Sequence, residues 1–488
     1  MRKTKIICTL GPATDGPVLA ELMKAGMNVA RMNFSHGSHE EHKARMDAVK
    51  HARKELGLPI GIMLDTKGPE IRTKTYKDGK IEIQDGQLFT LTTRDIEGDS
   101  TIVSISYEGL PADVQPGTRI LIDDGLVAFD VVEVKNGTDI VCKALNGGPL
   151  SNRKSVNVPG IKLNMPYLSD KDRADIEFGL TQGIDFIAAS FCRTAQDVRD
   201  IKAILKANGQ EDVEIIAKIE NMEGVNNIAE ILDEASGVMV ARGDLGVEVP
   251  FQELPEIQKH LIKTCISRGK RVVTATQMLE SMAKNPRPTR AEVSDVANAV
   301  YDGTSAIMLS GETSVGKYPV ETVCAMSTIA ENAERTIHYD RRRTTRLEFQ
   351  NMDVSGDDKT NAIAHATCST THDLGAKCIV AFTESGSTAR AVSSYRPGAP
   401  IVGATPSEKT YHRLTMSWGV TPVLVPTRPS SDTELFELSA CAATEATGAK
   451  AGDIITVTAG MPVGKVNYTN TLRVLQLTEQ ILAHGFQD

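Results

Sequence analysis

The sequence predicts an α/β protein built on a closed barrel of eight parallel strands, a (β/α)8 TIM barrel. Short apolar segments rich in β-branched residues alternate with stretches of helical length. The segments are apolar almost throughout, which is typical of parallel strands that are buried on both faces. They are Thr4–Leu10, Asn28–Asn33, Ile60–Asp65, Phe186–Phe191, Glu214–Ile219, Gly237–Ala241, Arg271–Thr276 and Ala306–Leu309.

Amphipathic stretches such as Val18–Ala25 and Ile228–Ala235 separate these strands and are predicted to be the helices of the barrel. The residues between the third and fourth strands follow a different sequence pattern. Strands are expected there at Ile81–Ile83, Leu88–Thr92, Arg119–Ile122 and Ile140–Ala144, with turns at Asp85-Gly86, Asn136-Gly137 and Asn146-Gly147. The pattern predicts hairpins in a small inserted β-barrel domain that acts as a lid over the active face.

The C-terminal part of the chain predicts an open α/β domain. It follows a polar linker from Asp340 to Lys359. Its expected strands are Cys378–Thr383, Ile401–Thr405, Val423–Val425, Ile454–Thr458 and an edge strand, Leu472–Leu477. We therefore expect a barrel domain at residues 1–69 and 167–342, a lid domain at 70–166 and a C-terminal regulatory domain at 343–488.

The composition excludes several classes of protein. A net charge of −9 and a pI near 5.7 do not indicate a protein that binds nucleic acid. We expect no signal peptide and no membrane-spanning segment, and therefore a cytoplasmic protein. The eight cysteines form no Cys-x-x-Cys pair, so we expect buried free thiols and no structural zinc.

Polar residues gather where the predicted barrel strands end, which is where barrel enzymes bind their substrates. Six strands end in this way, at Arg31–His36, Asp65–Lys67, Lys218–Asn221, Arg242–Asp244, Thr274–Gln277 and Ser310–Glu312. Lys218 and Glu220 are two residues apart and therefore point to the same side of their strand. Asp244 ends the next strand, so Glu220 and Asp244 are suited to share a divalent cation.

Each of these residues also has a simpler interpretation. Lys218 and Glu220 can form a salt bridge at the barrel rim, and Gly243-Asp244 can be either an anion-binding helix N-terminus or a plain turn. Thr276 can donate to a substrate carboxylate or bond to backbone. Arg72 is either a phosphate clamp or a solvated charge.

The oxygens of Asn33, Ser35 and Asp65 suit a weakly bound monovalent cation, although capping side chains look the same. His36 is more often structural than catalytic. From the residues alone, the predicted site is a divalent metal on Glu220 and Asp244, with basic residues around a phosphorylated small acid. These basic residues are Lys218, Arg31 and Arg72. No Walker A motif is present.

Several segments closely resemble the pyruvate kinase family. They are Lys3–Pro12, Arg31–Gly37, Leu64–Thr73, Ile216–Asn221, Met239–Gly246, Thr274–Leu279, Asn285–Glu292 and Met308–Glu312. The resemblance covers essentially the whole chain, and its motifs from Lys218 to Gly246 are highly specific. It implies transfer of phosphate from phosphoenolpyruvate to ADP, giving pyruvate and ATP, in the last step of glycolysis.

The resemblance also implies roles for individual residues. Glu220 and Asp244 correspond to ligands of Mg²⁺ (or Mn²⁺), and Lys218 to the lysine that stabilises the moving phosphoryl group. Arg31 corresponds to a phosphate clamp, and Thr276 to the threonine near the enolate. Substrate is expected on Arg31, Arg72, Lys218, Gly243, Asp244 and Thr276.

Further positions match the family's ion and nucleotide sites. Asn33, Ser35, Asp65 and Thr66 match its K⁺ site, and Glu70 is the acidic residue of K⁺-dependent members, which implies activation by K⁺. His36 and Lys154 match nucleotide contacts. The segment Asn285–Arg290 resembles a subunit contact, which implies a homotetramer.

The C-terminal loop resembles the family's site for a phosphorylated effector, which implies allosteric control. Its expected ligands are Thr383, Ser385, Gly386, Ser387 and Thr388. Glu384 stands where some members activated by fructose-1,6-bisphosphate carry lysine, which disfavours that effector relative to AMP or a sugar monophosphate. An ordinary strand–helix turn is the alternative. The chain ends soon after Leu477, and we expect no appended phosphohistidine-type domain.

Two other functions are compatible with these residues. A metal-dependent aldolase or lyase acting on pyruvate also holds Mg²⁺ with Glu and Asp on neighbouring barrel strands. The predicted lid, the Lys218 motif and the C-terminal domain disfavour it. The second alternative is an inactive relative that only binds a sugar phosphate, which the intact set Lys218, Glu220, Asp244 and Thr276 disfavours.

Overall fold

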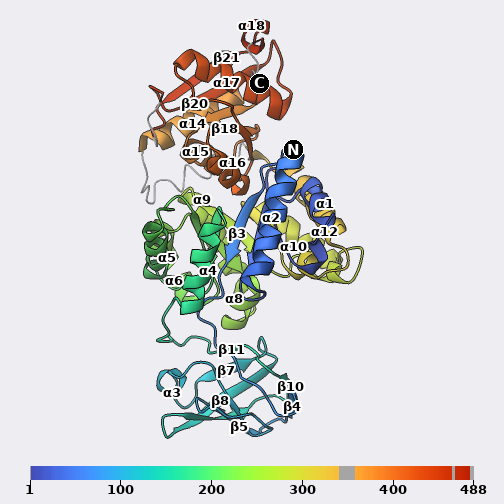
Figure 1. Ribbon diagram of the computed structural model, residues 1–488, viewed down its shortest axis with the longest axis vertical. Helices are drawn as coiled ribbons and strands as arrows, with labels where there is room; N and C mark the ends of the chain where they lie inside the picture. Colours follow the sequence, from blue (N-terminus) through green and yellow to red (C-terminus); the bar gives the residue numbers. More distant parts are fainter. Residues whose placement is uncertain (1, 340–357, 464–467, 484–488) are drawn as a thin grey trace.

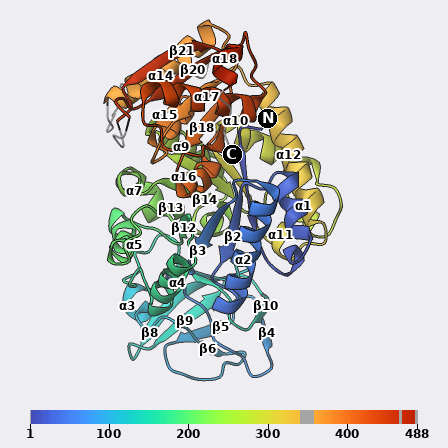
Figure 2. The same ribbon diagram turned by 45° about the horizontal axis from the view of Figure 1, so that its top comes forward.

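The computed structural model describes residues 2–339, 358–463 and 468–483. Three bodies follow one another along the long axis of the molecule (Figure 1). The barrel occupies the middle, the inserted strands lie at one end and the C-terminal α/β domain at the other, and the turned view keeps this order (Figure 2). The two smaller bodies are therefore placed at opposite ends of the barrel.

Eight parallel strands close the barrel in the order β1-β16-β15-β14-β13-β12-β3-β2. They are β1 Lys5–Thr9, β2 Val29–Asn33, β3 Gly61–Asp65, β12 Phe186–Ala189, β13 Glu214–Ile219, β14 Gly237–Ala241, β15 Arg271–Ala275 and β16 Ala306–Leu309. Each predicted strand is present, with ends that differ by at most two residues. The predicted (β/α)8 fold is confirmed.

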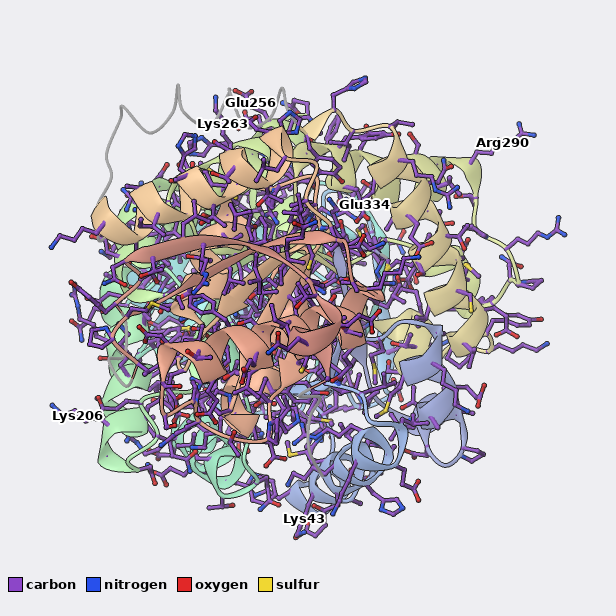
Figure 3. The ribbon with its side chains drawn as sticks, turned by 90° about the horizontal axis from the view of Figure 1, so that it is seen from above. Lys43, Lys206, Glu256, Lys263, Arg290 and Glu334 are labelled. Atoms are coloured by element: carbon purple, nitrogen blue, oxygen red, sulfur yellow. The ribbon has the colours of Figure 1, made fainter. Side chains whose placement is uncertain are left out.

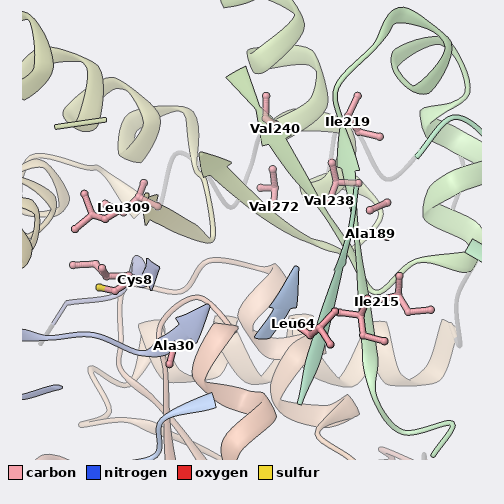
Figure 4. Packing of buried hydrophobic residues seen from close by; sticks show 14 of the residues in the cluster. Cys8, Ala30, Leu64, Ala189, Ile215, Ile219, Val238, Val240, Val272 and Leu309 are labelled. Atoms are coloured by element: carbon pink, nitrogen blue, oxygen red, sulfur yellow. The ribbon is translucent and has the colours of Figure 1, made fainter. Parts of the chain in front are cut away.

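The strands are buried on both faces, as their apolar sequences predict. Alternate residues such as Ile7, Ile216 and Val273 fill the barrel interior. Their neighbours point outward against the helices, where Ile215 lies near Leu64 and Val238 near Val272 (Figure 4). Met416 of the C-terminal domain joins the interior cluster. The barrel core is therefore completed by a side chain from another domain.

Helices cover the outside of the barrel. The longer ones are α1 Val18–Ala25, α2 His39–Leu56, α4 Asp170–Thr181, α5 Ala195–Ala207, α9 Leu254–Ser267, α10 Arg290–Asp302 and α12 Pro319–Arg335. Shorter segments are η1 Pro12–Thr14, α6 Met222–Asn226, α7 Ile228–Glu234, α8 Arg242–Glu248, η2 Glu280–Ala283 and α11 Gly311–Ser314. Lys43, Lys206 and Arg290 project from their outer edge (Figure 3). Among the helices of the described ranges, none has both the length and the apolarity needed to cross a bilayer.

The inserted residues form a six-stranded sheet, β11-β7-β8-β9-β5-β6, and a two-stranded sheet, β10-β4, which share one core. Their elements are β4 Lys80–Ile83, β5 Leu88–Thr92, β6 Ile102–Ser104, α3 Leu110–Asp113, β7 Arg119–Ile122, β8 Val127–Lys135, β9 Asp139–Ala144, β10 Gly148–Ser151 and β11 Val156–Asn157. Asn136-Gly137 joins the paired strands β8 and β9 as a hairpin, with positive φ at both residues.

The other two predicted hairpin turns do not connect paired strands. β4 pairs with β10 rather than with β5, so the turn at Asp85-Gly86 leads from one sheet to the other. The turn at Asn146-Gly147 likewise connects β9 to β10, which lie in different sheets. These two hairpin predictions were wrong because a turn sequence fixes a chain reversal and not the partner of each strand.

The C-terminal domain contains an open five-stranded sheet, as predicted, and its strand order is β19-β18-β17-β20-β21. Its elements are α14 Asp358–Asp373, β17 Ile379–Phe382, α15 Ser387–Ser394, β18 Ile401–Thr405, α16 Glu408–Arg413, η3 Leu414–Met416, β19 Val420–Leu424, α17 Asp432–Thr447, β20 Ile454–Ala459, β21 Thr471–Gln476 and α18 Glu479–Leu482. β21 is an antiparallel edge strand. The predicted linker lies largely outside the described residues, and its last two residues belong to α14.

Candidate active site

Lys218 lies where three neighbouring strands end. Its Nζ atom is 3.1 Å from Asp65 Oδ1, 2.8 Å from Ser190 Oγ and 3.0 Å from Glu220 Oε1. The barrel order β13-β12-β3 explains this convergence, because Lys218 belongs to β13, Ser190 follows β12 and Asp65 ends β3. The predicted salt bridge between Lys218 and Glu220 is therefore present and forms part of a larger cluster.

Asp65 links Lys218 to Arg31. Arg31 Nε donates to Asp65 Oδ2 at 2.6 Å, and Arg31 Nη1 donates to Thr9 Oγ1 at 2.8 Å. Burial alone would raise the pKa of Asp65, but Arg31 and Lys218 outweigh it and lower that pKa. Burial likewise opposes the charge on Lys218, whose pKa is nevertheless raised by Asp65 and Glu220. Lys218 consequently stays charged on the active face.

The carboxyl groups of Glu220 and Asp244 interact with one another. Burial raises the pKa of Glu220 to about 7, and it also raises the pKa of Asp244. Glu220 Oε2 accepts a hydrogen bond from the Phe191 amide at 2.5 Å. Phe191 has φ 52°, a backbone conformation that is rare for a bulky residue and that aims its N–H at the carboxylate.

This carboxyl pair fits a hard divalent cation. Glu220 Oε1 is fully buried and accepts no hydrogen bond from any described residue, although Lys218 Nζ is close to it. A metal ion would satisfy that oxygen and compensate the charge of two carboxyl groups whose pKa values burial raises. The described residues contain no cluster of three or more His, Cys, Asp and Glu side chains arranged to hold a metal. Two carboxylates suit Mg²⁺, which keeps several waters or takes substrate oxygens.

Thr276 and Gly243 lie side by side at the ends of β15 and β14. Thr276 Oγ1 donates to the Ala275 carbonyl at 2.6 Å and accepts from the Gly243 amide at 2.7 Å. In this structure the Gly243 amide, which begins the possible anion-binding helix N-terminus, is therefore already bound by Thr276. Thr276 also has φ 69°, which is strained for a β-branched residue.

Arg72 lies at the entrance to the inserted domain. Its guanidinium is 2.6 Å from Glu70 Oε1 and donates to the Arg153 carbonyl at 2.8 Å. No described contact joins Arg72 to Arg31 or Lys218, so the structure does not assemble the three predicted basic residues into one cluster. A cleft of about 360 Å³ lies between the inserted strands and the barrel. Its lining includes Glu70, Ser155, Phe191, Asn221, Asp244 and Glu248.

The four residues predicted to bind K⁺ surround the ends of β2 and β3. Asn33 lies opposite Asp65 in the β2–β3 ladder, and Asn33 Oδ1 accepts from the Ser35 amide at 3.1 Å. Thr66 Oγ1 accepts from the Ser190 amide at 3.1 Å. The register therefore brings Asn33, Ser35, Asp65 and Thr66 to one edge, with the Asp65 carboxylate occupied by its cationic neighbours.

The predicted nucleotide contacts belong to two different bodies. His36 is exposed above β2, and its carbonyl accepts from His42 Nε2 at 2.8 Å. Lys154 lies in the inserted domain, where its Nζ is 2.9 Å from Asp123 Oδ1. Within the described residues no contact joins His36 to Lys154. A ligand that touches both would have to span the space between the barrel and the inserted domain.

The predicted effector loop connects β17 to α15. Its backbone is held by Thr383, whose Oγ1 accepts from the Gly386 amide at 2.9 Å, and Gly386 has φ 85°. Ser385 Oγ donates to Ser387 Oγ at 3.2 Å, and Thr388 Oγ1 is 2.8 Å from Thr469 Oγ1. A cavity of about 230 Å³ adjoins the loop and is lined by Thr383, Ser385, Ser387, Thr388 and Arg428.

Glu384 pairs with Arg428 across this cavity, with 2.6 Å between Glu384 Oε1 and Arg428 Nη2. The acidic side chain that distinguishes the loop is therefore partly neutralised by a cation that also lines the cavity. A phosphorylated ligand would compete with Glu384 for Arg428.

Comparison with known proteins identifies the family. The family model described as pyruvate kinase, barrel domain, matches residues 1–323, and the model described as pyruvate kinase, alpha/beta domain, matches residues 361–475. The chain belongs to the pyruvate kinase family. The resemblance found in the sequence is thereby confirmed.

Individual pyruvate kinases agree with this assignment over nearly the full chain. The enzyme of Clostridium acetobutylicum is 48% identical over 476 residues, covering 97% of this chain and 99% of its own. That of Staphylococcus saprophyticus is 47% identical over 487 residues, covering 99% of this chain and 82% of its own. A crystal structure of a Cryptosporidium parvum pyruvate kinase superposes with a TM-score of 0.91 at 40% identity, covering 97% of this chain and 96% of that one. The predicted enzyme class, a phosphotransferase, is confirmed.

Sequence reasoning missed three partners of the pyruvate kinase cluster. Ser190 binds Lys218 and Asp65, Thr9 binds Arg31, and the Phe191 amide binds Glu220. Ser190 and Thr9 both carry hydroxyls at the ends of apolar strands, and that signal could have found them. The amide of Phe191 has no signature in the sequence, because its direction depends on one backbone angle.

Proposed function

We propose that this pyruvate kinase transfers the phosphoryl group of phosphoenolpyruvate to ADP. The bond between phosphorus and the enol oxygen breaks, a bond from phosphorus to the β-phosphate oxygen of ADP forms, and the enolate takes up a proton to become pyruvate. The position of Lys218 carries the proposal, because its ammonium lies among the side chains of three strand ends and is held charged there.

The charged groups of the cluster would have different roles in the reaction. Lys218 and Arg31 would stabilise the negative charge of the phosphoryl group in transit, and Asp65 holds both cations in place. Glu220 and Asp244 would hold Mg²⁺ or Mn²⁺. When bound, the metal supplies a Lewis acid that neutralises charge on the phosphoryl and enolate oxygens.

Thr276 and Gly243 would bind the carboxylate end of the substrate. The Gly243 amide is available to substrate only when Thr276 gives it up, since the two are hydrogen-bonded here. If the Thr276 hydroxyl also leaves the Ala275 carbonyl to which it donates here, it would lie near the developing enolate, where either it or a water that it orients delivers the proton. Arg72 would reach the substrate when the inserted domain moves as a lid toward the barrel.

Monovalent cation and nucleotide sites complete the proposal. Asn33, Ser35, Asp65 and Thr66 would bind K⁺, supported by their placement around the ends of β2 and β3. Glu70 would favour a cation near Asp244, whose pKa it raises. His36 and Lys154 would contact ADP from opposite sides of the cleft.

The C-terminal cavity supports allosteric control by a phosphorylated effector. Thr383, Ser385, Gly386, Ser387 and Thr388 would bind its phosphate at the start of α15. AMP or a sugar monophosphate fits the loop better than fructose-1,6-bisphosphate, because Glu384 repels a second phosphate. We also propose a cytoplasmic homotetramer with a contact at Asn285–Arg290, and the domain limits 1–69 with 167–342, 70–166 and 343–488.

Release of pyruvate from phosphoenolpyruvate, measured with and without ADP, tests the central proposal. Pyruvate that appears only when ADP, Mg²⁺ and K⁺ are all supplied, with one ATP formed for each, is the expected result. Release that is independent of ADP would instead support a lyase. An inactive protein that still binds a sugar phosphate would identify a non-catalytic relative.

A further inference from the structure

The loop that follows β2 is held by two side chains that have no role in the proposed reaction so far. It contains Phe34, Ser35 and His36, of which Ser35 would bind K⁺ and His36 would contact ADP. Lys171 Nζ donates to the Phe34 carbonyl at 3.0 Å. His42 Nε2 donates to the His36 carbonyl at 2.8 Å. Both carbonyl groups that flank Ser35 are therefore occupied.

His42 is suited to hold this loop. It lies on α2, is 4% exposed, and stacks on the Phe34 ring with 4.0 Å between the ring centroids and 16° between their planes. Burial is the main reason that the pKa of His42 is lowered, so its ring is neutral near pH 7. A carbonyl can only accept, so the single ring proton lies on Nε2 and is used in the bond to His36.

Lys171 reaches the loop from the first turn of α4. Its ammonium also binds Asp175, one turn further along the helix, with 2.5 Å between Nζ and Oδ2. Asp175 is 2% exposed, and its Oδ1 atom is 2.7 Å from Nε2 of His39 on α2. The ammonium is thus oriented by a buried carboxylate and directs another of its three donors at the Phe34 carbonyl.

The backbone that carries Lys171 is itself fixed. Ser169 and Asp172 form a capping box at the start of α4. Asp172 is fully buried, and its Oδ1 atom accepts from the Gly68 amide at 3.0 Å, close to the point where the chain leaves the barrel for the inserted domain. Lys171 therefore projects from a rigid support, which is what a side chain needs in order to set the position of a loop.

The two bonds restrict which oxygens the loop can offer to an ion. The carbonyls of Phe34 and His36 are taken by donors on α4 and α2, so the side chain of Ser35 remains as the ligand from this loop. Asn33, at the end of β2, is tied to it because Asn33 Oδ1 accepts from the Ser35 amide. A weakly bound monovalent ion gains little free energy from each oxygen, so the cost of ordering a loose loop would dominate its affinity.

We propose that Lys171 and His42 are positioning residues for the monovalent cation and the nucleotide. The inference rests on the proposed function, because Ser35 and His36 are the ligands that would be positioned. Lys171 would fix the place of the Ser35 hydroxyl beside K⁺, and His42 would fix the direction from which His36 meets ADP. Neither residue would touch the substrate or the reacting atoms.

The K⁺ requirement of the full-length enzyme tests Lys171. Activity is measured while KCl is replaced stepwise by tetramethylammonium chloride at constant ionic strength. Lys171→Met should raise the K⁺ concentration for half activation about fivefold, with little change in kcat at saturating K⁺. Lys171→Arg keeps a cationic donor and should restore most of the affinity. Lys43→Met is the matched control, because Lys43 also pairs with an aspartate four residues further on, Asp47, at 2.5 Å but contacts no loop carbonyl among the described residues.

Ser35→Ala separates a failure of this inference from a failure of the K⁺ site. The variant removes a proposed ligand and should itself raise the K⁺ requirement. If it does so while Lys171→Met does not, Lys171 only supports the fold and the inference is overturned, even where Lys171→Met lowers the unfolding midpoint or kcat. If neither variant changes the K⁺ requirement, the proposed K⁺ site is wrong and the positioning role of Lys171 falls with it.

The KM values for the two substrates test His42. His42→Phe keeps a ring that can stack on Phe34 but removes the donor to the His36 carbonyl, so the KM for ADP should rise several-fold while that for phosphoenolpyruvate stays unchanged. His42→Gln retains an N–H donor and should recover part of the loss. His51→Phe, at an exposed position on the same helix, is the control. An unchanged KM for ADP in His42→Phe, or an equal rise for both substrates, would refute the positioning role.

Discussion

Two buried glutamates at opposite ends of one strand have pKa values that are shifted in opposite directions. Glu214 begins β13 and Glu220 follows its last residue, and both lie on the inward side, which they share with Lys218. Burial raises the pKa of Glu220 to about 7, whereas the pKa of Glu214 is lowered although burial opposes the decrease. The two ends of one strand therefore have opposite electrostatic character.

The neighbours of each glutamate explain the contrast. Glu214 faces three guanidinium groups, from Arg271, Arg390 and Arg413, which together outweigh its burial. Glu220 faces one cation and a second carboxyl group. The Glu214 carboxylate is surrounded by arginines from two domains. The Glu220–Asp244 pair has one cation for two carboxyl groups and therefore favours a metal ion. The raised pKa of Glu220 beside the Asp244 carboxyl thus fits a metal ligand, and the lowered pKa of Glu214 among arginines fits a structural ion pair.

Replacing Lys218 with methionine should have the largest effect, because it removes the cation at the active-site end of β13. We expect kcat to fall about a thousandfold, equivalent to about 4 kcal/mol, because the charge on the transferring group loses its cation. Steady-state assays measure the fall, and circular dichroism checks the fold. Lys24→Met on the surface of α1 is the control and should keep full activity. A Lys218→Met enzyme with most of its turnover would remove Lys218 from the reaction.

Replacing Glu214 with glutamine removes the carboxylate at the other end of β13. Loss of the carboxylate leaves Arg271 and Arg390 buried without their anion, which should lower the free energy of unfolding by about 3 kcal/mol near neutral pH. The folded-state pKa of Glu214 lies below the ordinary 4.5, so its contribution is full above that pH and is lost as the pH falls through the lower value.

Denaturant unfolding of both proteins at a series of pH values measures this difference. The gap between wild type and Glu214→Gln should shrink below pH 4.5. A gap that is constant with pH would show that the carboxylate is not responsible for the stabilisation.

Replacing Glu220 with glutamine tests whether this carboxylate is a metal ligand. The apparent affinity for Mn²⁺ should fall about tenfold, because one anionic ligand is lost. Mn²⁺ binding measured by electron paramagnetic resonance reports it without any need for turnover. Glu214→Gln is the matched control and should bind Mn²⁺ as the wild type does. Equal metal affinity in the two variants would mean that the raised pKa of Glu220 does not mark a ligand.

The smallest effect is expected at Glu70, which belongs to neither end of β13. Glu70→Lys places a fixed ammonium at the acidic position that we propose is linked to K⁺ activation, and the variant should need several-fold less K⁺. Activity with KCl replaced by tetramethylammonium chloride measures this requirement. Because the variant also breaks the ion pair with Arg72, Arg72→Gln serves as the control. An unaltered K⁺ requirement would count against the proposed role.

The sequence predicted the barrel well because each strand is a short apolar run whose environment is set by its own residues. It predicted the inserted domain less well. β8, the longest strand, was missed because a bulge between Val131 and Glu133 interrupts the alternation of buried and exposed residues. The pairing of β4 with β10 was missed because it joins segments that are far apart in the chain.

The site shows the same division between local and non-local information. The shared direction of Lys218 and Glu220 follows from the period of two residues in a strand, and the structure brings them together with Asp244. The hydrogen bond between Thr276 and Gly243 depends on a left-handed backbone that no pattern of residues reveals. Arg72 was grouped with Arg31 because both are basic, but charge does not say how close the inserted domain brings Arg72 to the barrel, and here it pairs with Glu70 instead.

Met416 has a consequence for how the protein is made. It is part of the barrel interior, yet it is translated long after β16, the last barrel strand. A ribosome therefore releases all eight strands before the residue that fills one end of their interior exists. During that interval the nascent barrel has an exposed apolar opening, which is the type of surface that chaperones bind.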